Sequence, residues 1–223
     1  MNEWPGRRRD LVRRVWQMMA EDLTTHGREV KRMWKGTSQA DREALAVFPM
    51  AFGACLAAYP QVTSGVRSIL VMVQMQACVR AFLIGLHMSG SPKVTWFMRL
   101  RSLLKAQRMP PLLPDEKIDS YRQQAESALE AVRVDPYVAR LAAVLVADHS
   151  SRNEMGMKLR QLLSVLTVRD MADLEAYYAC CEDLLRYAVP RPQAVQALMV
   201  WVVHGPHRAL LTGYELAAEH TPV

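Results

Sequence analysis

Hydrophobic residues recur along this chain at the spacing of one helix face, and they do not alternate in the way that marks a β-strand. The sequence also has no Asn-Gly or Asp-Gly pair, the usual signal of a tight hairpin. We therefore predict an all-α protein. Its expected helices lie near residues 7–25, 27–35, 39–58, 64–88, 92–108, 115–132, 136–148, 152–166, 168–188, 192–204 and 206–219.

Signals for helix starts and stops support these bounds. In three places a hydroxyl residue is followed three positions later by an acid, the pattern of a capping box, beginning at Ser38, Ser151 and Thr167. The hydroxyl accepts a hydrogen bond from a free backbone N–H, and the acid lies in the positively charged first turn. Near the end of the chain, Gly205 and Pro206 predict a break or kink between the last two helices.

The helix near 64–88 is apolar on nearly all sides, which is typical of a helix at the centre of a bundle. Residues 69–86 within it are also the one stretch whose length and composition suggest a membrane span. Arg80 lies within it, however, and would cost about 2.5–3.5 kcal/mol in lipid. We predict a buried helix, and a multi-helix bundle of about ten helices around it.

Charge divides the chain at a proline-rich connector, residues 109–114. Residues 1–110 have 17 Lys and Arg and 7 Asp and Glu, a net charge of +10, whereas residues 111–223 have 11 and 15, a net charge of −4. We predict a basic helical half over 1–108 and an acidic helical half over 115–223, as two domains or as parts of one continuous domain. Such asymmetry favours an acidic ligand for the basic half.

Nine basic residues of the first half fall at helical spacing and predict three cationic faces. Like charges at this spacing repel by about 0.2–0.5 kcal/mol per pair, and phosphate groups would relieve that repulsion. On the central face, Val30, Met33 and Trp34 fall on the other side of the helix and are expected to point to the core. We predict that the nine residues bind a nucleic-acid backbone: Arg9 and Arg13; Arg28, Lys31, Arg32 and Lys35; Arg101, Lys105 and Arg108.

Four of the five tryptophans lie in the basic half: Trp4, Trp16, Trp34 and Trp96. Exposed tryptophans beside cations suit single-stranded nucleic acid, because bases stack on them. We nevertheless expect these tryptophans to lie mainly in the core, where large aromatic side chains bury the most area.

Motifs for cofactors, metals and catalysis are absent from the sequence. There is no phosphate loop, no G-x-G-x-x-G and no H-E-x-x-H. The cysteines show no C-x-x-C spacing and are expected to be buried free thiols. His204 and His207 are three apart, but the expected break at Gly205 and Pro206 would separate them. We therefore predict no cofactor, no metal and no catalytic residue.

Together these features predict a non-enzymatic helical subunit of a nucleoprotein complex. Its basic helices would contact DNA or RNA backbone without reading sequence, and its tyrosine- and tryptophan-rich helices over 168–219 would hold protein subunits. The absence of a signal-peptide pattern favours the cytoplasm. Two alternatives stay open: a helical adaptor or regulator that binds an acidic protein without nucleic acid, and an enzyme or ligand sensor built from scattered residues.

Overall fold

The computed structural model describes residues 6–89 and 154–220, which form helices joined by short loops, with no strand among them. The all-α class predicted from the sequence is thereby confirmed. The predicted number of about ten helices is not confirmed, because the helices expected at 92–148 lie outside the described residues, as does the connector 109–114. The elements are α1 (Gly6–Glu21), the π-helix η1 (Asp22–His26), α2 (Gly27–Gly36), α3 (Gln39–Ala57), α4 (Ser64–Ser89), α8 (Glu154–Leu163), α9 (Val168–Ala188) and α10 (Pro192–His220).

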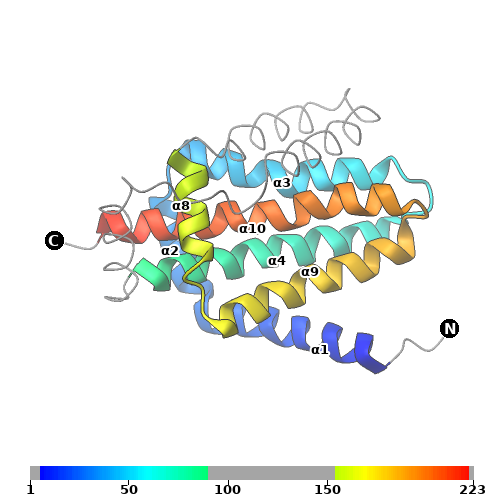
Figure 1. The fold of residues 1–223 in the computed structure, drawn as a ribbon, viewed down its shortest axis with the longest axis horizontal. Helices are drawn as coiled ribbons and strands as arrows, with labels where there is room; N and C mark the ends of the chain where they lie inside the picture. The colour runs from blue at the N-terminus through cyan, green and yellow to red at the C-terminus, as the bar shows by residue number, and fades with distance from the viewer. Residues whose placement is uncertain (1–5, 90–153, 221–223) are drawn as a thin grey trace.

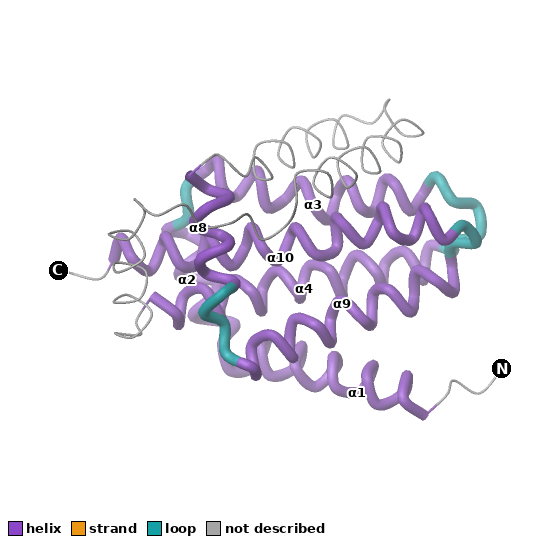
Figure 2. The backbone as a smooth tube through the Cα atoms, viewed as in Figure 1, coloured by secondary structure: helices purple, strands orange, loops and turns teal. Residues whose placement is uncertain are grey.

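The long helices lie side by side as a bundle (Figure 1). α1, α4 and α10 run in one direction, and α3 and α9 run in the other. α4 packs against α3, α9 and α10, while α1 lies along α9. The short loops 58–63 and 189–191, which join α3 to α4 and α9 to α10, lie at the same end of the bundle (Figure 2). The other end holds α2 and α8, together with the last turns of α4 and α10.

α4 and α10 form a parallel pair whose backbones touch. A Cβ on Gly213 would lie 2.2 Å from the carbonyl oxygen of Phe82, and a Cβ on Gly85 would lie 2.1 Å from that of Leu210. Real side-chain carbons do not approach backbone oxygens so closely, so glycine is required at both crossings. Upstream in the same pair, the buried Gln74 side chain donates a hydrogen bond to the carbonyl of Trp201 over 3.4 Å.

α4 has the length and hydropathy of a membrane-spanning helix, with a mean hydropathy of 1.9 in its most apolar window. In the structure, 56% of that window is buried within the bundle. Leu70, Val73, Ala77 and Ala81 pack into the two hydrophobic clusters that fill the core. Burial of this kind is also what the inner helix of a bundle shows.

Two of the three predicted capping boxes are confirmed. The Ser38 hydroxyl accepts a hydrogen bond from the backbone N–H of Asp41 at 3.1 Å, at the start of α3. Thr167 does the same for Asp170, also at 3.1 Å, at the start of α9. The box at Ser151 lies outside the described residues. The bounds of α2, α3, α4 and α9 agree with the sequence prediction to within one residue.

The predicted break at Gly205 and Pro206 is wrong, since α10 continues through both residues. Proline in a helix interior removes one backbone hydrogen bond and costs about 3 kcal/mol. Here both residues are buried, and Gly205 lies against Cys78 and Phe48, so packing in the core offsets that cost. His204 and His207 consequently share one helix, where His204 contacts Phe48 and His207 contacts Tyr178.

The first two predicted helices are also joined. α1 passes into α2 through the π-helical turn η1 rather than through a break near Gly27. A π-turn inserts extra backbone into a helix and is frequent at functional sites. It ends at His26, which brings this side chain and Glu29 toward the end of α4.

Candidate functional site

α2 carries the one predicted cationic face that the structure describes in full. Arg28, Lys31, Arg32 and Lys35 are all exposed. Within the described residues none of these four side chains forms an ion pair or donates a hydrogen bond to a carboxylate. Four uncompensated cations therefore lie on a single ten-residue helix.

The opposite side of α2 holds the helix to the bundle, as the sequence predicted. Val30 and Met33 pack against the core cluster formed by the ends of α4 and α10. The Trp34 ring meets Phe82 edge-on, with ring centroids 6.2 Å apart. The backbone carbonyl of Lys35 accepts a hydrogen bond from Arg42 of α3 at 3.4 Å. These contacts fix which face of α2 points outward.

The other predicted cations are less fully described. Arg13 on α1 is exposed and lies 3.3 Å from the Asp10 carboxylate, an exposed ion pair one turn away. Arg9 lies on α1 too, but its side chain is outside the described part of the structure. Arg101, Lys105 and Arg108 lie outside the described residues, so the face that they were expected to form stays a prediction.

The tryptophans depart from the expected core placement. Trp16 on α1 is 50% exposed, and Trp34 lies at the surface with one edge on Phe82. Trp201 of the C-terminal half is buried instead. Trp4 and Trp96 lie outside the described residues. Trp16 lies on the same helical run as the cations, and an exposed indole ring of this kind can stack on a base.

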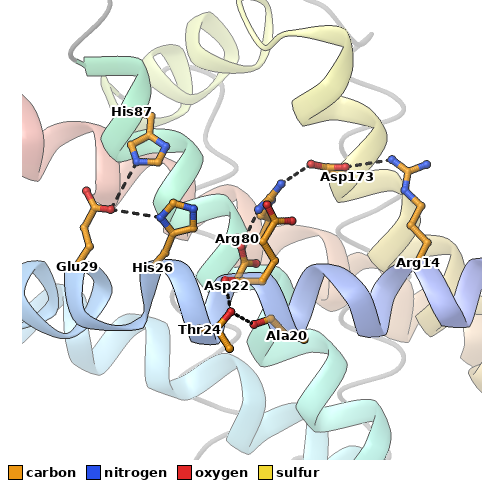
Figure 3. A network of polar contacts seen from close by, with 10 residues as sticks. Arg14, Ala20, Asp22, Thr24, His26, Glu29, Arg80, His87 and Asp173 are labelled. Carbon is orange, nitrogen blue, oxygen red and sulfur yellow. Dashed lines mark hydrogen bonds and ion pairs between the residues drawn. The ribbon is translucent and has the colours of Figure 1, made fainter.

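Not every cation of the basic half is available to a ligand. Arg80 of α4 donates hydrogen bonds of 2.6 Å to Asp22 of η1 and of 2.6 Å to Asp173 of α9 (Figure 3). Arg14 of α1 donates a hydrogen bond of 3.0 Å to Oδ1, the other carboxylate oxygen of Asp173. This four-residue set, the Arg80 network, joins α1, η1, α4 and α9. It neutralises two cations that contribute to the charge asymmetry of the sequence.

Burial and pairing shift the pKa values in the Arg80 network in different directions. Burial works against the charge of Arg80, but its bonds to Asp173 and Asp22 outweigh that effect and raise the pKa of the guanidinium. Burial also opposes the charge of Asp173, yet hydrogen bonds from Arg80 and Arg14 lower the pKa of this carboxyl below 3.8. Asp22 is fully buried at its side chain, and desolvation prevails over Arg80, so the pKa of Asp22 is raised.

A pocket of about 380 Å³ opens where η1, the last turns of α4 and the first turn of α9 meet. Its walls include apolar residues of α4 and Val165, and seven polar residues line it: Glu21, His26, Arg80, His87, Thr167, Arg169 and Asp170. Sequence reasoning missed this pocket because its walls come from segments more than fifty residues apart.

Beside the pocket, two histidines and one glutamate face one another (Figure 3). His26 Nδ1 lies 3.5 Å from Glu29 Oε2, and His87 Nε2 lies 3.7 Å from the same oxygen. The two imidazole rings meet edge to face, with centroids 5.8 Å apart. The His26-x-x-Glu29 spacing was visible in the sequence, since i and i+3 share a helix face. Nothing local connects that pair with His87.

The helices that were expected to hold protein partners bury two of their five aromatic residues. Tyr177 and Trp201 are fully enclosed in the core between α4, α9 and α10. Tyr187 at the end of α9 is 77% exposed, and Val168 and Met171 are exposed at its start. Only these side chains of α9 are free to meet a partner among the large hydrophobic residues described.

No protein-family model, curated protein or solved structure matches this chain.

Proposed function

We propose that this protein binds the sugar–phosphate backbone of a nucleic acid through α2, as a non-enzymatic helical subunit of a nucleoprotein complex. The observation that carries the proposal is the exposed face of Arg28, Lys31, Arg32 and Lys35. Arg14 and Arg80, by contrast, are paired with Asp173. The cations of α2 are therefore free to neutralise an external polyanion.

The dimensions of the face fit a phosphate backbone. From Arg28 to Lys35 the helix rises by about 10.5 Å, so α2 lying parallel to a duplex axis would pass about three phosphate steps of one strand, which rises 3.4 Å along that axis per phosphate. Each cation can thus meet a different phosphate. Side chains that contact phosphates alone carry no sequence information, so binding through this face is independent of sequence.

The rest of the complex would be held by α9. Tyr187, Val168 and Met171 expose apolar area on α9, and aromatic and apolar side chains of this kind are enriched in protein interfaces. We place the contact with protein subunits there, within the 168–219 helices, and the nucleic acid on α2.

The decisive variant reverses all four cations of the face, R28E/K31E/R32E/K35E. The matched control reverses four other arginines, R67E/R169E/R186E/R191E, and so changes the net charge by the same amount. Retention of labelled single-stranded DNA and RNA on a filter is measured for both, with far-UV circular dichroism to verify helix content. We expect the face variant to lose retention and the control to keep most of it.

The salt dependence gives a second reading. Loss of four phosphate contacts makes the log–log slope of affinity against salt shallower by about 3.6 on duplex and about 2.8 on single strands. If the face variant retains nucleic acid with an unchanged slope, α2 is not the binding surface. If the wild-type protein retains none, and binds an acidic protein instead, the adaptor alternative holds.

A further inference from the structure

We propose that His26, Glu29 and His87 bind a divalent transition-metal ion of the zinc class. All three ligand atoms lie within 4.8 Å of one another. Two imidazole nitrogens and one carboxylate oxygen make a donor set that suits Zn²⁺ and its first-row neighbours. This inference does not depend on the proposed binding of nucleic acid.

The distances in the cluster suit a shared ion better than direct hydrogen bonds. The two nitrogen–oxygen separations are 3.5 and 3.7 Å, longer than the 2.7–3.2 Å or so of an ordinary N–H···O bond. Ligand atoms bound tetrahedrally to zinc at about 2.0–2.1 Å lie about 3.4 Å apart. Both measured separations are near that value, so a metal ion could enter with little movement of Glu29.

The remaining adjustment is small and the side chains have room for it. The ligand atoms farthest apart, at no more than 4.8 Å, must approach by at most about 1.4 Å to reach tetrahedral spacing. The side chains of His26, Glu29 and His87 are partly exposed, at 27%, 36% and 56%. A change of rotamer therefore suffices, without displacing a helix.

The local backbone explains why these residues meet. η1 ends at His26, and α2 begins at the next residue, so His26 and Glu29 lie one turn apart on one face. His87 lies in the last turn of α4, which runs parallel to α1 and η1 and is tied to them by the bond from Arg80 to Asp22. The Arg80 network thus holds the two ligand-bearing segments in register.

The pocket gives the ion a position that the protein does not fill. His26 and His87 belong to the cluster and also line the pocket of about 380 Å³. Three protein ligands with one open position are the pattern of zinc sites that exchange water or a small ligand, whereas structural sites are closed by four protein ligands. Because both histidines line the pocket, we expect the fourth position to face it, where water or a small anion would complete the coordination.

The test is metal binding by the full chain, without nucleic acid. A competition titration of Zn²⁺ against a chromophoric chelator gives stoichiometry and affinity. We expect one ion per chain. Removing an outer-shell partner already weakens metal sites by about 10–100-fold, so Glu29→Gln and His87→Ala should each weaken binding by at least about 100-fold. His207→Ala and Glu182→Gln are the matched controls, and we expect both to bind like the wild type.

Two further readouts keep the result interpretable. Co²⁺ should give visible absorption bands of a low-coordinate nitrogen and oxygen site in the wild type, lost in His87→Ala. Zn²⁺ should raise the Tm of the wild type and leave those of the ligand variants unchanged, because only the folded wild type offers the site. Equal Zn²⁺ affinity in the wild type, Glu29→Gln and His87→Ala, or no binding below millimolar Zn²⁺, would overturn the proposal.

Discussion

Replacing Arg80 by methionine removes the guanidinium that joins three helical segments while keeping most of the side-chain volume. Asp22 then loses its 2.6 Å ion-pair partner, and its second oxygen, Oδ2, already has no hydrogen-bond donor among the described residues. Asp173 also loses a 2.6 Å bond but keeps Arg14 at 3.0 Å. Arg14 is half exposed, so the compensation that it offers is weaker than that of Arg80.

The cost follows from leaving a buried charge without its partner. Such a removal typically destabilises a protein by about 3–5 kcal/mol. The side chain of Asp22 is fully buried and that of Arg80 is 12% exposed, so we expect a loss within this range. It is a large fraction of the 5–15 kcal/mol or so by which most domains are stable, and it corresponds to a fall in Tm of about 10 °C for a protein of this size.

The pH dependence gives the prediction its sign. In the wild type, the lowered pKa of Asp173 means that its stabilising contribution is present above about pH 3.8 and is lost as the pH falls further. In the wild type burial already raises the pKa of Asp22; in Arg80→Met, loss of the cation should raise it further and should bring the pKa of Asp173 above its unfolded value. Their protonated forms then favour the folded state, so the variant's deficit should be largest near pH 7 and shrink toward pH 4.

Urea unfolding followed by far-UV circular dichroism measures both effects, at pH 7 and pH 4.5. The double variant Arg80→Met with Asp22→Asn is the matched control, because it removes the stranded charge along with its partner. It should recover part of the lost stability at pH 7. A deficit for Arg80→Met below about 1 kcal/mol, or one that does not change with pH, would refute the view that this network is a buried ion pair.

Two further substitutions test the packing and the caps. Gly213→Ala places a Cβ 2.2 Å from the carbonyl oxygen of Phe82 and should destabilise the protein by about 1–3 kcal/mol or more. The control Gly65→Ala meets nothing within 4 Å and should be neutral or stabilising. Equal urea midpoints for the two variants would contradict the close crossing of α4 and α10. Thr167→Ala removes the cap of α9 and should cost about 1 kcal/mol, and Thr167→Asn should restore most of it. A silent Thr167→Ala in the same unfolding assay would mean that the cap contributes nothing.

Local features of this protein were readable from its sequence. The capping boxes at Ser38 and Thr167 depend on residues three apart, and both form as predicted. The amphipathic pattern of α2 likewise predicted its outward cations and its inward Val30 and Met33. In each case the interacting groups belong to one helix, so helix geometry alone decides which side they share.

Contacts between residues far apart in the chain could not be predicted from the sequence. The local signals at Arg80 and Pro206 were misleading for that reason. Arg80 entered the sequence argument only as a cost of membrane insertion, because its partners Asp22 and Asp173 lie 58 and 93 positions away. His87 showed no relation to His26 and Glu29. Pro206 predicted a helix break because proline alone disfavours a helix interior, but the packing of α10 against α4 overrides that effect.

Long-range ion pairs also change how the net charge of the basic half is interpreted. Counting residues suggests a surface positive throughout, but Arg14 and Arg80 meet Asp173, and Arg208 of the acidic half meets Asp41 of the basic half at 3.0 Å. Some charges of opposite sign from the two halves therefore form ion pairs with each other in the bundle. An external polyanion responds to the cations that remain exposed, because its phosphates cannot reach a guanidinium held between buried carboxylates. Among the described helices, α2 has the largest group of such exposed cations, so reversing its four charges should weaken binding more than reversing any four charges on the other described helices.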